Sequence, residues 1–107
     1  MNRVKFTGGI CRLILRMREE GEIPLLDSVK RSAGEQNDLF LAGKSKCDGY
    51  KKLSQHQRGK AADIYFIDKN DPSRLAPPIN GYAYWHQVWE STGGSKVINW
   101  DQGHFEG

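Results

Sequence analysis

Residues 60–67 read KAADIYFI, and this stretch decides the central strand of the fold. Alanine, aliphatic and aromatic side chains occupy both alternating sets of positions, so both faces of an extended strand would be largely covered. Asp63 lies inside it, between Ala62 and Ile64. A buried carboxylate needs a cation or several hydrogen-bond donors. We therefore expect Asp63 to belong to a site; the alternative is an aspartate at a strand edge that faces water.

A histidine lies shortly before this strand. Residues 54–59 read SQHQRG, so His56 precedes Asp63 by seven positions. A lone histidine in a polar stretch is more often a surface residue than a ligand. The interpretation of His56 therefore depends on partners elsewhere in the chain.

Such partners are present in residues 100–107, which read WDQGHFEG. Asp101 and His104 are three positions apart, and an uninterrupted strand would point them to opposite faces. Gly103 allows the chain to curl there, which would bring both side chains to the same side. The alternative is an ordinary polar turn.

Together these side chains complete the set that a catalytic zinc ion requires. His56, Asp63 and His104 would be the ligands, and a fourth position would be open to water. Asp101 would remain to take the proton of that water. The only other histidine, His86, lies in a predicted aromatic helix, where a structural contact is the simpler interpretation; it is the first rival as a ligand.

The remaining sequence predicts an α+β domain, because helices and strands do not alternate as βαβ units. We expect helices over 10–20, 32–42 and 81–90 and strands over 60–67, 97–100 and 104–106, with an extended connection over 22–26 and loops over 44–53 and 68–78. The second helix begins with Ser32-Ala33-Gly34-Glu35, a capping-box pattern, so Arg31 would project from a well-fixed end.

Composition predicts a single domain over residues 1–107, since this length leaves no room for two. Eleven Phe, Tyr and Trp residues can anchor a core. No apolar run is long enough for a membrane span, and the first 20 residues lack the apolar stretch of a secretory signal. We expect a monomer that is cytoplasmic at synthesis. Cys11 and Cys47 form no CxxC motif and are expected to be reduced, although their pairing stays open.

The net charge of +3 is best explained by a mildly basic surface. We expect no nucleic-acid partner, because the lysine-rich segment 44–52 offers only Tyr50 for base stacking. Attraction to an anionic polymer such as a bacterial cell wall is a further interpretation. The oxygen-rich segment 68–71 lacks the calcium-loop pattern and is expected to be a plain turn.

Three motifs resemble the zinc peptidase family M15, which includes D-Ala-D-Ala carboxypeptidases and dipeptidases and phage L-alanyl-D-glutamate endopeptidases. SQHQRGKAAD at 54–63 matches the pattern S-x-H-x-x-G-x-A-x-D. WDQGHFEG resembles the family's closing segment, where a base precedes the third ligand by three residues. RSAGEQ at 31–36 resembles its arginine-containing segment at the start of a helix.

The resemblance implies a role for six residues: His56, Asp63 and His104 as zinc ligands, Asp101 as general base, Arg31 as a substrate or oxyanion contact, and Ser54 beside the substrate. It also implies the small α+β fold of hedgehog signalling domains, with helices packed on one side of an antiparallel sheet that carries the zinc.

The activity that the resemblance implies is hydrolysis of a peptide bond in peptidoglycan stem peptides. An aspartate as base looks more like the phage endolysin branch, which favours an L-alanyl-D-glutamate endopeptidase over a D-Ala-D-Ala carboxypeptidase. A non-catalytic zinc-binding domain, as in hedgehog-type relatives, is the alternative of another class. The enzyme would reach the cell wall after release, through a phage holin or as a virion component.

Overall fold

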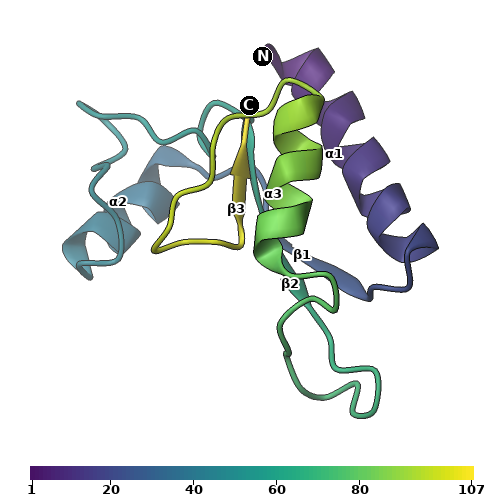
Figure 1. Ribbon diagram of the computed structural model, residues 1–107. Helices are drawn as coiled ribbons and strands as arrows, with labels where there is room; N and C mark the ends of the chain where they lie inside the picture. Colours follow the sequence, from purple (N-terminus) through teal and green to yellow (C-terminus); the bar gives the residue numbers. More distant parts are fainter.

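The computed structural model describes residues 1–107 and contains three helices and three strands (Figure 1). In chain order these elements are α1 (Arg3–Glu19), β1 (Pro24–Ser28), α2 (Ala33–Leu41), β2 (Ala61–Phe66), α3 (Tyr82–Ser91) and β3 (His104–Glu106). The strands form one antiparallel sheet in the order β1-β2-β3. The predicted α+β class is therefore confirmed.

The core lies between the sheet and two of the helices. Figure 1 shows α1 and α3 side by side, with α2 on the other side of β3. Ala62, Ile64 and Phe66 of β2 are at most 1 % exposed and pack in one apolar cluster with residues of α1 and α3. Because side chains alternate along a strand, Asp63 belongs to the opposite face. That face, which we call the open face, carries the candidate site.

Helix α1 begins at Arg3, so the prediction of a start at residue 10 is wrong. The Asn2 side chain accepts a hydrogen bond from the Lys5 N–H at 2.8 Å and caps the helix. Gly9 lies inside the helix, where a Cβ would stand 3.1 Å from the Trp89 ring. The glycine thus permits close approach of α1 and α3, although by propensity alone it disfavours a helix.

Two predictions about strands are wrong. Residues 24–28 form β1 instead of an extended connection; Leu25 and Leu26 are 43 % and 45 % exposed, so the sequence gives no clear alternation there. Residues 97–100 form no strand, because the chain turns and the Ile98 carbonyl accepts a hydrogen bond from the Asp101 N–H at 2.9 Å.

The other predicted elements are present. The capping box at Ser32 forms with both of its hydrogen bonds, and β2, α3 and β3 lie where the sequence places them, within one residue at each end. Segment 44–53 contains neither helix nor strand, and segment 68–78 contributes only an isolated bridge between Ile67 and Leu75. None of the helices combines the length with the apolar character needed to cross a membrane. Cys11 and Cys47 are both unpaired.

A glycine after α3 allows the contact that joins this helix to β3. Trp89 Nε1 donates a hydrogen bond to the Glu106 carbonyl at 2.8 Å, and a Cβ on Gly94 would overlap the indole. We expect Gly94→Ala to lower the free energy of unfolding by about 2–3 kcal/mol, because the indole must move and loses this bond. Urea denaturation measures the effect.

Gly34→Ala is the matched control for that substitution. Gly34 lies in α2, and its added Cβ would have Ser32 Oγ at 3.9 Å as its nearest neighbour. Alanine there should leave stability unchanged or raise it slightly, because it is the better helix former. Equal stabilities of the two variants would contradict the role given to Gly94.

Candidate metal centre

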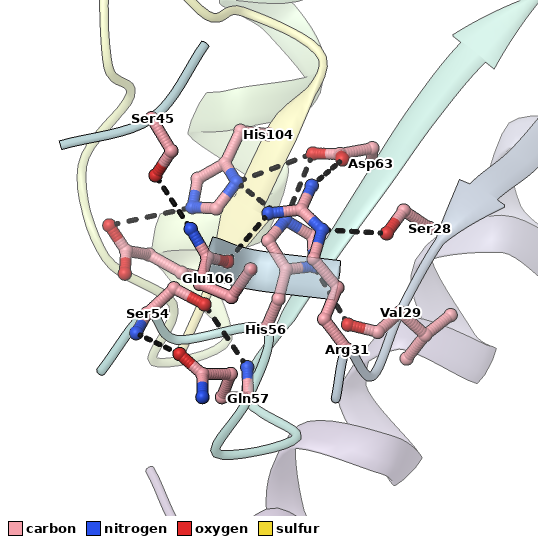
Figure 2. A network of polar contacts seen from close by, with 11 residues as sticks. Ser28, Val29, Arg31, Ser45, Ser54, His56, Gln57, Asp63, His104 and Glu106 are labelled. Atoms are coloured by element: carbon pink, nitrogen blue, oxygen red, sulfur yellow. Dashed lines mark hydrogen bonds and ion pairs between the residues drawn. The ribbon is translucent and has the colours of Figure 1, made fainter. Parts of the chain in front are cut away.

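The three predicted ligands converge on the open face of the sheet (Figure 2). His56 comes from the turn before β2, Asp63 from the middle of β2 and His104 from the first position of β3. His56 Nε2 lies 3.2 Å from His104 Nδ1 and 3.3 Å from Asp63 Oδ1, and His104 Nδ1 lies 3.3 Å from the same oxygen. These side chains form a group that could hold a metal ion.

Local structure explains this convergence. Asp63 and His104 are direct partners in the β2–β3 register, so their side chains lie side by side on one face. His56 lies in a turn that closes with the Gly59 N–H donating to the His56 carbonyl at 3.1 Å. Gly59 has φ +68, a left-handed conformation that favours glycine and directs the chain into β2.

Burial decides between the alternatives that the sequence left open. His56 is 2 % exposed and Asp63 is 6 % exposed. His56 is therefore not a surface histidine, and Asp63 is not an edge aspartate that faces water. A buried aspartate between two histidines is the arrangement expected of a site.

A hydrogen bond of His56 and an ion-pair contact of His104 show which imidazole nitrogens face the centre. His56 Nδ1 lies 2.7 Å from the Val29 carbonyl, which can only accept, so Nδ1 carries the proton and Nε2 presents its lone pair to the site. His104 Nε2 lies 3.7 Å from Glu106 Oε1, which leaves Nδ1 directed at the centre. Metal-ligating histidines usually have such a partner for the second ring nitrogen.

Three potential acceptor atoms thus lie within 3.3 Å of one another, an unfavourable arrangement unless a proton or a cation lies among them. Without a metal, a proton shared among these atoms relieves their repulsion. Burial lowers the pKa of His104, but the hydrogen bond to Asp63 and the nearby carboxylates outweigh it, so this pKa is raised. Burial raises the pKa of Asp63, yet the two histidines bring it well below its usual value. A metal ion would replace the proton.

Arg31 contacts the second oxygen of the same carboxylate. Its Nη2 lies 3.1 Å from Asp63 Oδ2, while Nε donates to Ser28 Oγ and Nη1 to Gln36 Oε1, both at 3.3 Å. The capped start of α2 therefore holds a guanidinium that keeps Asp63 oriented, with Oδ1 directed at the histidines (Figure 2). Its predicted role as a substrate or oxyanion contact stays a prediction.

Asp101 and Ser54 share a cavity with the two histidines of the metal-competent group. This cavity of ≈ 320 Å³ is also lined by Arg31, His56 and His104. Asp101 is exposed, and its carbonyl accepts a hydrogen bond from the His104 N–H at 3.0 Å, so the predicted tight turn is present. Ser54 Oγ accepts from the Gln57 N–H at 3.2 Å, which gives this serine a structural role within its turn.

Two residues support the site without belonging to the ligand group. Glu106 was missed, although its position two residues after His104 in a strand places it on the same face. His86 makes the expected structural contact: it stacks on Phe105 at 4.1 Å, and Nε2 lies 2.6 Å from the Gln102 carbonyl. Burial lowers the pKa of His86, so a neutral ring donates this bond and holds the turn at 101–104.

Comparisons with known proteins give no family. A scan against models of protein families finds no match for the chain, and a search of curated proteins finds none either. The structure shows an α+β fold and a His-His-Asp group that could hold a metal ion. This arrangement is compatible with a metalloenzyme.

Proposed function

We propose that this protein is a zinc-dependent peptidase that hydrolyses a peptide bond in bacterial peptidoglycan stem peptides, most simply the L-Ala–D-Glu bond. The observation that carries the proposal is the placement of Asp101 in the same cavity as His56 and His104, two members of the metal-competent group. The motif resemblance in segments 31–36, 54–63 and 100–107 supports the substrate class.

The donor set suits zinc. Two imidazole nitrogens and one carboxylate oxygen are typical of catalytic zinc sites, which keep a fourth position open. Calcium and magnesium prefer all-oxygen surroundings. When bound, zinc would supply a Lewis acid that activates water at neutral pH and polarises a carbonyl.

The chain's own residues would then divide the remaining work. Asp101 would accept the proton of the attacking water and pass it to the leaving amine nitrogen. Asp63 would stay ionised between the histidines and Arg31. Arg31 lines the cavity, and its guanidinium would also favour negative charge developing on the carbonyl oxygen.

Asp101→Ala tests the assignment of the base. The variant should bind zinc as the parent does, because no ligand changes, yet its hydrolysis rate should fall by about 10²–10⁴, the usual contribution of a positioned general base. Zinc content and the release of peptide fragments from purified peptidoglycan are the two measurements. A variant that cleaves at the parent rate would show that Asp101 is not the base.

The control is Asp38→Ala, which removes the same charge from an exposed position of α2 outside the cavity. It should change neither zinc content nor rate. Mass spectrometry of the digest identifies the bond: new N-terminal D-Glu indicates the endopeptidase, and free D-Ala indicates the carboxypeptidase. One zinc ion per chain without any product would indicate a non-catalytic zinc domain.

A further inference from the structure

A second cavity adjoins the candidate metal centre. It has a volume of ≈ 430 Å³ and is lined by Gly43, Lys44, Ser45, Lys46, Trp100 and Asp101. Lys44, Ser45 and Asp101 line both cavities, so the two meet around the proposed base. The chemistry of the second cavity therefore bears on whatever lies beside Asp101.

This cavity offers positive charge and an aromatic surface. Trp100 is 83 % exposed, whereas Trp85 and Trp89 are 0 % exposed. Lys46 Nζ lies 5.6 Å from the centre of the Trp100 ring, within the range of a cation–π contact. With Lys44, the lining includes two lysines against a single acidic residue, Asp101.

The backbone that carries these lysines is anchored. Gln36 is 0 % exposed, and its Nε2 donates to Ser45 Oγ at 2.7 Å and to the Cys47 carbonyl at 2.9 Å. The Lys44 N–H donates to the Leu39 carbonyl at 2.9 Å. Both lysines therefore extend from a segment fixed to α2, and they stay beside the turn that carries Trp100 and Asp101.

We infer that Lys44, Lys46 and Trp100 form a subsite for a free α-carboxylate on the substrate residue whose nitrogen is the leaving group. This inference rests on the proposed function. If Asp101 returns a proton to the leaving nitrogen, the residue that bears this nitrogen must lie next to Asp101. The adjoining cavity is then the nearest space for the group on its α-carbon, and its two lysines suit an anion.

The subsite explains how stem peptides would be told from ordinary peptides. In an ordinary peptide, the carboxyl group of the leaving residue is an uncharged amide. D-Glu in a stem peptide continues through its γ-carboxyl, so its α-carboxylate is free, and a C-terminal D-Ala also carries a free α-carboxylate. Both candidate bonds therefore present the same anion to the lysines.

Matched pairs of substrates test the inference. Each pair has the L-Ala–D-Glu bond or the D-Ala-D-Ala bond, with the leaving residue bearing either a free α-carboxylate or its carboxamide. For the bond that it cleaves, the zinc-loaded protein should have a kcat/KM about tenfold or more higher on the carboxylate substrate than on the carboxamide. This is the size of one lost charge-assisted hydrogen bond. The pair that shows the preference identifies the source of the carboxylate.

The double variant Lys44→Gln, Lys46→Gln should lose this preference by becoming slower on the carboxylate while retaining its rate on the carboxamide. Lys51→Gln, Lys52→Gln is the matched control, because these exposed lysines belong to the same loop but line neither cavity. The control should keep the full preference. Hydrolysis with an unchanged preference in the Lys44, Lys46 variant would overturn the subsite while leaving the proposed function intact.

A binding measurement can support the carboxylate subsite even if the proposed peptidase function fails. Acrylamide quenching reports mainly on Trp100, because the other two tryptophans are buried. The dipeptide γ-D-Glu-L-Lys, which has no bond of either kind to cleave, should protect Trp100 in the zinc-loaded protein, and its α-carboxamide should not. Protection that requires Lys44 and Lys46 without any hydrolysis would support the subsite and reject the peptidase. Equal protection by both probes would reject the subsite.

Discussion

Replacing His104 with alanine is expected to weaken zinc binding by about a hundredfold or more and to abolish hydrolysis. Structural zinc sites bind with about 10–16 kcal/mol, so each of four ligands accounts for roughly 3 kcal/mol, or about two orders of magnitude. His104 is also the residue that joins β3 to the site, through its contacts with His56 and Asp63. The third histidine, His86, is not part of the metal-competent group.

Zinc affinity by chelator competition measures this effect, and thermal unfolding gives a second readout. Zinc should raise the melting temperature of the parent and have little effect on the His104→Ala variant, because a ligand stabilises only the state that binds it. Asp38→Ala is again the control, since Asp38 is exposed on α2 and lies outside the ligand group. Parent affinity in His104→Ala would refute the ligand assignment.

Glu22→Ala is expected to lower the free energy of unfolding by about 3–5 kcal/mol, a large fraction of the total for a small domain. Glu22 is 5 % exposed and accepts three hydrogen bonds: from Trp85 Nε1 at 2.7 Å, from the Ile79 N–H at 2.8 Å and from the Asn80 N–H at 3.0 Å. Alanine would leave three donors without this acceptor. The carboxylate thus fixes α3 and the segment before it to the end of α1.

Chemical denaturation of Glu22→Ala beside Glu19→Ala tests this expectation. Glu19 is exposed at the end of α1, so its substitution should change stability by less than about 0.5 kcal/mol. Glu22→Gln keeps the shape and one acceptor oxygen and should lie between the two. If Glu22→Ala proved as stable as Glu19→Ala, the three hydrogen bonds would have no net role in stability.

The parts of the fold that the sequence predicted are those with local signals. KAADIYFI marks β2, and the capping box at Ser32 marks the start of α2. Strand β1 was missed because its outward side chains are half exposed, so its conformation depends on pairing with β2. The early start of α1 was missed because the fit of Gly9 against Trp89 is a tertiary contact.

In the candidate site, too, the features with local sequence signals could be predicted and those that depend on tertiary packing could not. The ligand group could be predicted because two short motifs carry it, and the β2–β3 register then aligns Asp63 with His104. The three-way anchoring of Arg31 could not, because it depends on where α2 packs. The cavity beside Trp100 requires segment 44–46 to meet the turn at 100–101, and no local pattern encodes that meeting.

The spacing of the metal-competent residues along the chain has a consequence for folding kinetics. His56 and His104 are 48 positions apart, and Val29, which fixes the His56 ring, is 27 positions from it. Closing such loops costs entropy before their contacts form, so the centre should assemble only after β1 and β3 have both joined β2. Interactions absent from the transition state act mainly on unfolding. A bound metal ion should therefore prolong the lifetime of the native state far more than it accelerates folding.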